Sequence, residues 1–258
     1  MKTPNIIAFA IFLILITIVN PASAEETIKV RVANWPPQYF QDKNENWIGA
    51  DVELIHAIIK EAGFKVEYQN LPWARGVLYL KNGKIDAIPI FSITDERKEY
   101  AKWIGPYRHV TINLIVKKGV ALKISSLNDM IKESNVKGVR FGHQHKAFFS
   151  KEYNDRLKHD PVFKRCFEII PNQENNLKKL RAGRILGFFG ARGAIDYRIK
   201  NDPKYSGIEI HPYVLDSSPA YIGISKKTDQ KIYDSLESAY RKTEKNGTLG
   251  KIRDKWGY

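Results

Sequence analysis

The chain has 258 residues, a formal net charge of +14 and a single cysteine, Cys166. This length allows one large domain or two lobes of about a hundred residues each, and one cysteine excludes an internal disulfide. The positive charge favours acidic partners, but Lys and Arg are scattered along the chain. We therefore interpret them as a solvated basic surface, with a contribution to anion capture as the alternative.

The N-terminal segment has the pattern of a secretory signal. Lys2 precedes an apolar run at residues 6–19 in which only Thr17 is polar, and the small residues of Ala22-Ser23-Ala24 follow. The run is shorter than the roughly 20 residues of a membrane helix, and no cysteine for lipid attachment lies near the cut. We therefore predict cleavage after residue 24 and a periplasmic protein that does not meet nucleic acid.

The chain that follows alternates between predicted helices and strands. Residues 51–63 illustrate the helical pattern, because apolar residues recur at helical spacing from Val52 to Ala62 and Gly63 ends the segment. The same reading predicts the following early elements: strands at 27–34, 64–70 and 85–91, a helix at 73–83 and a long β-rich run at 109–119.

A second alternation occupies the rest of the chain. We predict helices at 127–134, 147–157, 174–183 and 191–200, extended segments at 139–143, 166–172, 185–189 and 207–215, then a short strand at 220–224 and helices at 229–245 and 249–256. This order is typical of an α/β protein with a mainly parallel sheet covered on both faces. Open sheets of this kind bind ligands outside the carboxyl ends of their strands.

Two such runs separated by extended connectors predict two α/β lobes. We expect residues 25–114 to form the first part of lobe 1 and residues 115–212 to form lobe 2. Residues 213–258 should return to lobe 1, because the last two helices have no sheet of their own. A ligand would then bind in the cleft between the facing lobes.

One helix start carries an arginine where an acid would be expected. In the stretch FSITDERKEY, Thr94 is the predicted cap, Asp95 and Glu96 fill the first turn and Arg97 is the third helical residue. A cation near the positive end of a helix costs about 0.3–1 kcal/mol. We infer that Arg97 either receives a negative ligand or forms an exposed ion pair with Asp95 or Glu96.

Several stretches resemble the extracytoplasmic solute-binding proteins of polar amino-acid ABC importers, family 3. The similar segments are GADVELIHAIIKEA at 49–62, NGKIDAIPIFSITDER at 82–97, GPY at 105–107 and NGTLGKIRDKWGY at 246–258. Ala50 departs from the usual larger apolar residue. The resemblance implies a type II periplasmic-binding-protein fold, in which two hinge strands join two lobes around a ligand cleft.

The resemblance also implies roles for the residues of the Thr-x-x-Arg motif. Arg97 matches the arginine that grips the ligand carboxylate, while Ser92 and Thr94 match residues that add hydroxyl and backbone hydrogen bonds. A guanidinium presents a fixed fork that fits a carboxylate, and the adjacent helix start adds further donors.

Aromatic residues are the next candidates for the first-lobe wall. Trp35 and Phe91 match positions where the family places rings against the ligand, and Tyr39 lies in the same loop as Trp35. Trp73 begins a helix on the same side of the sheet, where it either lines the cleft or packs in the core. Arg75 repeats the anomaly of Arg97 and is a candidate second anion contact.

The second lobe departs from the pattern of amino-acid binders. Lys146-Ala147 stands where a Gly-Thr or Gly-Ser is usual, and Gly190-Ala191-Arg192 stands where an aspartate usually meets the ligand ammonium. No acid follows until Asp196. These departures favour a carboxylate-rich or otherwise anionic ligand, with Lys146 and Arg192 as candidate contacts.

Other chemistries have weaker support. His143 and His145 share a strand face but lack a third metal ligand nearby, and no phosphate-binding glycine loop is present. A dehydratase on this fold needs a positioned acid or base, for which Asp216 is the one loose candidate. A free-standing sensor that docks on a membrane receptor is a further alternative.

We therefore predict a monomeric binding protein rather than an enzyme. It would need no metal or cofactor, would close over a small polar, anionic or amino-acid-like ligand, and would deliver that ligand to an ABC permease in the inner membrane.

Overall fold

The computed structural model describes residues 26–257, so the predicted signal segment lies outside the described residues. Its strands are β1 (Thr27–Val32), β2 (Phe40–Gln41), β3 (Trp47–Ile48), β4 (Lys65–Asn70), β5 (Ala87–Ile88), β6 (Ala101–Lys117), β7 (Phe141–Gln144), β8 (Phe167–Ile170), β9 (Gly187–Ala191) and β10 (Ile208–Ser225). Its α-helices are α1 (Ala50–Glu61), α2 (Trp73–Lys81), α3 (Asp95–Lys98), α4 (Leu127–Lys137), α5 (Lys151–His159), α6 (Pro161–Arg165), α7 (Gln173–Arg181), α8 (Arg192–Asn201), α9 (Gln230–Lys245) and α10 (Thr248–Trp256).

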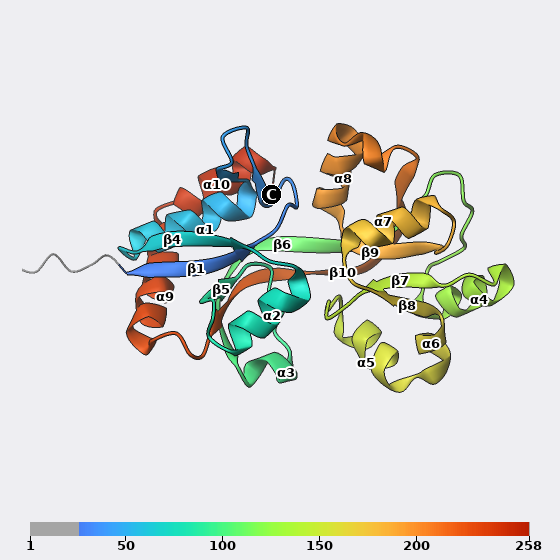
Figure 1. The fold of residues 1–258 in the computed structure, drawn as a ribbon, viewed down its shortest axis with the longest axis horizontal. Coiled ribbons are helices and arrows are strands. Elements are labelled where there is room, and N and C mark those ends of the chain that lie inside the picture. Colours follow the sequence, from blue (N-terminus) through green and yellow to red (C-terminus); the bar gives the residue numbers. More distant parts are fainter. Residues whose placement is uncertain (1–25, 258) are drawn as a thin grey trace, which may run out of the picture.

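Two long strands join two halves of one sheet (Figure 1). The eight strands follow the order β4-β1-β5-β10-β6-β9-β7-β8, and β6 pairs antiparallel with β10 along most of both strands. On either side of this pair the outer strands are parallel, β1 with β4 and β5, and β7 with β8 and β9. We call the half around β1 the first lobe and the half around β7 the second lobe.

The first lobe has separate apolar clusters that hold its helices to the sheet. One cluster joins β1 to α1, α9 and α10 through residues such as Val30, Leu54, Leu236 and Leu249. The C-terminal helices therefore pack on the first lobe, beside α1 (Figure 1). A second cluster, which includes Leu80 and Phe91, joins α2 to β5.

The second lobe is covered on both faces of its sheet. Phe188 and Phe189 are neighbours on β9, and successive strand residues point to opposite faces. Phe189 packs in a cluster with α4, α5 and α6, whereas Phe188 packs with α7 and α8. Both side chains are almost fully buried, so β9 is a central strand.

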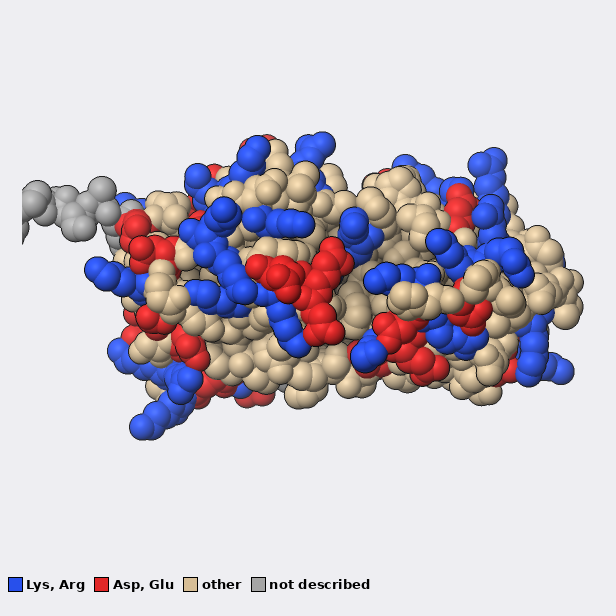
Figure 2. Space-filling model, turned by 90° about the horizontal axis from the view of Figure 1, so that it is seen from below, with Lys and Arg blue, Asp and Glu red and all other residues tan. Residues whose placement is uncertain are grey.

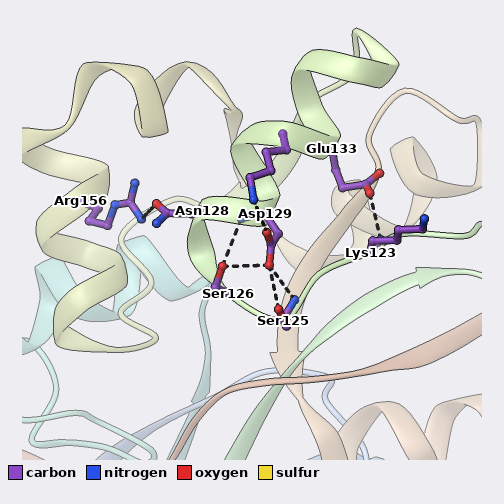
Figure 3. A network of polar contacts seen from close by, with 8 residues as sticks. Lys123, Ser125, Ser126, Asn128, Asp129, Glu133 and Arg156 are labelled. Atoms are coloured by element: carbon purple, nitrogen blue, oxygen red, sulfur yellow. Dashed lines mark hydrogen bonds and ion pairs between the residues drawn. The ribbon is translucent and has the colours of Figure 1, made fainter.

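Polar contacts fix the beginning of α4, the first helix after the β6 crossing (Figure 3). Ser126 caps the helix, with its Oγ accepting from the Asp129 N–H at 3.3 Å, and the Asp129 carboxylate accepts from the hydroxyls of Ser125 and Ser126. The hydrogen bond from Lys132, together with those from Ser125 and Ser126, holds the pKa of Asp129 well below its usual range. The arrangement differs from a capping box, because the carboxylate accepts from the backbone N–H of Ser125, at 3.1 Å, one residue before the cap.

The predicted and observed elements differ in a few places. Residues 208–225 form one strand, whereas the sequence predicted two separate segments at 207–215 and 220–224. Residues 216–220 pair with β6 in continuous register, Pro219 opposite His109, and the register shifts of β10 lie on either side of this stretch. The hairpin of β2 and β3 and the short helix α6 were not predicted, and the strand at 85–91 shortens to β5. The lobe boundaries at residues 114 and 212 stay predictions, and both fall inside the two long strands.

The charged side chains show no single basic patch on the face drawn in Figure 2. Lys and Arg are spread over both lobes there and alternate with acidic groups. Within residues 26–257, no helix combines the length and apolar character needed to cross a membrane.

Candidate ligand-binding site

A cavity of about 90 Å³ lies where the two lobes face each other. The first lobe, the paired strands β6 and β10, and the second lobe all contribute to its wall. The lining residues are Trp35, Tyr39, Trp73, Ile90, Ser92, Arg97, Val110, Ile112, Gln144, Ala147, Phe148, Phe149, Gln173, Gly190, Ala191, Asp216, Ser218, Pro219 and Ala220.

Arg97 is a buried cation in this wall. Its residue exposure is 5%, and its Nη1 and Nη2 donate to the carbonyl oxygens of Ser92 at 3.0 Å and Lys146 at 3.5 Å. Burial lowers the pKa of the guanidinium to about 10, which still leaves it protonated at neutral pH. No carboxylate within the described chain forms an ion pair with it. The wall therefore offers a desolvated positive charge to a ligand.

The helix cap that was predicted from the sequence, Thr94, holds the backbone of Arg97 in place. Thr94 Oγ1 accepts from the Arg97 backbone N–H at 3.2 Å, which confirms Thr94 as the cap of α3. Asp95 instead pairs with Lys98 at 2.9 Å, so the exposed ion pair considered for Arg97 is not formed with Asp95. Ser92 lines the cavity, whereas Thr94 lies in a neighbouring surface groove beside Arg97.

Phe91 supports the arginine from behind rather than lining the cavity. It is fully buried, and the Arg97 guanidinium lies 4.1 Å from its ring centroid. Gly223 on β10 makes room for this ring, because a Cβ there would lie 2.3 Å from Phe91 Cδ1. The Phe91 ring, which packs against Gly223 on one side and the guanidinium on the other, therefore fixes the position of the Arg97 guanidinium relative to β10.

Trp35, Tyr39 and Trp73 form the aromatic wall of the first lobe. A second buried arginine, Arg31, is 3% exposed and lies behind this wall. Its Nη1 donates to Tyr39 Oη at 2.9 Å, and its guanidinium carbon is 5.3 Å from the Trp73 ring centroid. Because the guanidinium holds both rings, Arg31 is a positioning residue for the wall.

The second lobe closes against the first lobe at two places. On one side, Trp73 Nε1 donates to the Lys146 carbonyl at 3.0 Å. On the other, Arg198 on α8 donates to the Asn34 carbonyl at 3.2 Å and lies over the Trp35 ring at 5.7 Å. These contacts come from both lobes and describe a closed cleft.

Besides Phe91 and Thr94, three further predicted contacts do not line the cavity. Lys146 reaches the cleft through its carbonyl oxygen, because its backbone adopts a left-handed conformation with φ 62° and its side chain is exposed. Arg75 is exposed on α2, and Arg192 is exposed on α8, where its Nε lies 3.5 Å from Asp196 Oδ2. Neither arginine is among the lining residues.

Polar residues that were not predicted as ligand contacts also line the cavity. Gln144, Gln173, Asp216 and Ser218 are all in the wall. Asp216 was singled out in the sequence only as a loose acid–base candidate, and no pattern in the sequence pointed to either glutamine. Their positions depend on how β7, α7 and β10 come together.

The two histidines considered for metal binding are in different environments. His143 is buried and its Nδ1 lies 3.0 Å from Tyr153 Oη, whereas His145 is exposed. Among the described residues, no group of three or more His, Cys, Asp or Glu side chains is placed to hold a metal ion.

Protonation of His143 is expected to destabilise the fold at acid pH. Burial, with a smaller contribution from His145, lowers its pKa to about 4 from 6.5. The unfolded chain then binds more protons between pH 6.5 and 4, so the free energy of unfolding falls as the pH is lowered through this window, by about 2–3 kcal/mol. Urea unfolding at pH 7 and pH 4.5 measures this loss.

His143→Gln keeps a hydrogen-bonding side chain but cannot be protonated. We expect its stability to depend less steeply on pH than that of the wild type, while His159→Gln, at an exposed position, keeps the wild-type slope. An unchanged slope in His143→Gln would contradict this explanation.

The fold and the site together define a class, the two-lobe binding proteins that enclose a ligand between α/β lobes. The model of the bacterial extracellular solute-binding proteins, family 3, matches residues 28–258. The chain belongs to this family.

Known relatives and structures agree with this assignment. The probable histidine-binding protein of Neisseria gonorrhoeae is 30% identical over 226 residues, which cover 87% of this chain and 80% of the relative. ABC transporter arginine-binding protein 1 of Escherichia coli (strain K12) is 27% identical, with 91% and 92% covered. A solved ancestral arginine-binding protein bound to arginine is 28% identical with a TM-score of 0.73, with 90% of this chain and 98% of that chain covered.

These relatives are described as binders of amino acids. None of the three is described as an enzyme or as a binder of an anionic solute. The expectation of a mainly anionic ligand, drawn from the second-lobe departures, therefore has no support among them.

Proposed function

We propose that the protein captures an amino acid between its lobes in the periplasm and delivers it to an inner-membrane ABC permease. The observation that carries the proposal is the buried Arg97 guanidinium, which lines the cavity and forms no ion pair with a carboxylate among residues 26–257. A ligand carboxylate supplies the missing negative charge, and a guanidinium fork suits it bidentately. The relatives named above support an amino acid as the source of that carboxylate.

Residues of the same site also form hydrogen bonds between the two lobes and so favour closure of the cleft. Arg97 and Trp73 of the first lobe both donate to the carbonyl oxygen of Lys146 in the second lobe, at 3.5 and 3.0 Å. A ligand that is held by Arg97 and also contacts second-lobe residues of the wall, such as Gln144 and Gln173, stabilises the arrangement in which these bonds form, and the population shifts from open to closed. The permease would recognise the closed pair of lobes, and the protein would act as a monomer.

A thermal-shift screen of residues 25–258 tests this proposal. The panel contains the common amino acids, dicarboxylates and small cyclic acids, and recovered ligand is analysed for chemical change. A ligand at a hundred times its dissociation constant adds about 2.7 kcal/mol, which raises the Tm by about 2–4 °C per kcal/mol at this size. A shift given by an amino acid that is recovered unchanged supports a binding protein, whereas turnover or no shift from any amino acid would contradict it.

A further inference from the structure

The cavity wall carries one charge of each sign. Among the lining residues described above, Arg97 is the one cation and Asp216 the one anion. Asp216 Oδ2 accepts from Ser218 Oγ at 2.7 Å, and no Lys or Arg of residues 26–257 forms an ion pair with this carboxylate. Asp216 thus presents an unneutralised negative charge to the same space as the Arg97 guanidinium.

The pairing of three strands places Asp216 in a row across the floor of the cavity. Asp216 on β10 is in register with Ile112 on β6, and Ile112 is in register with Ala191 on β9. All three residues line the cavity. The row therefore runs from the carboxylate of Asp216 to the beginning of α8, where Ala191 offers no polar side chain.

A buried acceptor lies at the β9 end of this row. Gln173, the first residue of α7, is 8% exposed and lines the cavity. Its Nε2 donates to the Phe189 carbonyl at 3.2 Å, which fixes the orientation of the amide, while its Oε1 has no hydrogen-bond partner among the described atoms. A buried acceptor left without a donor costs about 1–3 kcal/mol, so a donor on the ligand would relieve this cost.

We propose that Asp216 and Gln173 Oε1 receive the ammonium group of an amino acid whose side chain is uncharged. The inference rests on the proposed function, in which Arg97 holds the carboxylate. The ammonium would lie over the row of Asp216, Ile112 and Ala191, between the carboxylate at the β10 end and the Gln173 acceptor at the β9 end, and it supplies the positive charge and the N–H donors that these two groups lack.

The charge balance of the wall disfavours a charged side chain on the ligand. The carboxylate and ammonium of an amino acid already use the two charges of the wall, so a third ligand charge would be desolvated without a counter-ion, which is strongly unfavourable. The remaining surface is aromatic and aliphatic, with Trp35, Trp73 and Phe149 among its members. Arg31 adds a buried positive charge behind Tyr39 and Trp73 and further disfavours a cationic side chain. The site therefore selects against arginine and lysine, in contrast to the arginine-binding relatives.

Isothermal titration with named amino acids tests the selectivity. The wild-type protein is titrated with L-phenylalanine, L-leucine and L-glutamine, and with L-arginine and L-lysine. We expect the tightest uncharged amino acid to bind about 100-fold more strongly than either cationic one. Tighter binding of arginine or lysine would overturn the inference while leaving the proposed function standing, and no binding of any amino acid would remove both.

The second part of the experiment isolates the ammonium contact. The tightest amino acid is compared with its des-amino acid, for example 3-phenylpropionate for L-phenylalanine, on wild type, Asp216→Asn and Gln173→Met. We expect Asp216→Asn to weaken the amino acid by about 100-fold and Gln173→Met by about 10-fold, while neither variant changes binding of the des-amino acid by more than a few-fold.

Asp196→Asn serves as the matched control, because Asp196 is an acid on α8 outside the cavity wall. It should bind both compounds as the wild type does. Equal losses for the amino acid and the des-amino acid in Asp216→Asn would mean a structural role for Asp216 and would overturn the inference, as would unchanged binding of the amino acid.

Discussion

Replacing Arg97 by alanine is expected to weaken amino-acid binding by about 2–5 kcal/mol, the cost of removing one partner from a buried, hydrogen-bonded charge pair. This corresponds to a rise in Kd of roughly 30-fold to several thousand-fold. The size of the effect follows from the burial of the guanidinium, because solvent cannot replace it once the cleft is closed. Isothermal titration with the amino acid found in the screen measures the change.

Two further variants separate charge from geometry at this position. Arg97→Lys keeps the charge but loses the planar fork, so it should recover only part of the affinity. Lys98→Ala removes an exposed cation on the same short helix, one that pairs with Asp95, and should leave the Kd unchanged. If Arg97→Ala, shown to be folded by its urea transition, bound the amino acid within threefold of wild type, the assigned role of Arg97 would be wrong.

Replacing Asp51 by asparagine is expected to lower the free energy of unfolding by about 3–5 kcal/mol. Asp51 accepts from Arg108 Nε at 2.6 Å and from Nη2 at 2.9 Å, and both side chains are almost completely buried. The variant removes the carboxylate from a guanidinium that stays buried. A loss of this size is a large share of the 5–15 kcal/mol typical of a folded protein.

Urea denaturation checks this expectation through a lower transition midpoint with an unchanged m-value. Glu53→Gln is the matched control, because Glu53 lies on the same helix but pairs with Lys255 in solvent at 2.8 Å. It should cost at most about 1 kcal/mol. Equal midpoints for Asp51→Asn and the wild type would show that the buried pair contributes no net stability.

The contacts of Asp51 and Glu53 explain the two acids at the start of the family-like segment at residues 49–62. Gly49 has φ 126°, a conformation that favours glycine, and a Cβ there would lie 2.5 Å from the Gln38 carbonyl oxygen. Asp51 follows as the buried partner of Arg108, and Glu53 as an exposed partner of Lys255. The signature stretch thus stabilises the first lobe, and none of these three residues lines the cavity.

Local signals in the sequence were sufficient for the fold class and for the first-lobe motif. The type II two-lobe fold is confirmed by the solved relatives, and the Thr94 cap is formed as predicted. Helix capping and hydrophobic periodicity depend on residues a few positions apart, so both can be recognised in a single sequence. Arg97, Ser92, Trp35, Tyr39 and Trp73 are brought to the cavity wall because they follow strand ends of one sheet.

The direction of a side chain around a helix could not be predicted in the same way. Arg75 starts α2 as expected, but Gly76 is the residue that packs on β1, since a Cβ there would lie 2.9 Å from Arg31 Cγ. Arg75 therefore remains exposed. Asp216 reaches the cavity only through the pairing of β10 with β6, and β6 with β9, which no local pattern reveals.

The hydrogen bond from the Trp73 indole to the Lys146 carbonyl also links tryptophan fluorescence to the closure of the cleft. Indole emission depends on whether its N–H is bonded to protein or to water, and opening of the lobes exchanges one for the other. Trp35, the second tryptophan in the wall, lies under Arg198 of the opposite lobe and changes surroundings in the same movement. Two of the five tryptophans therefore make intrinsic fluorescence an unlabelled reporter of lobe closure, readable in a stopped-flow mixing experiment.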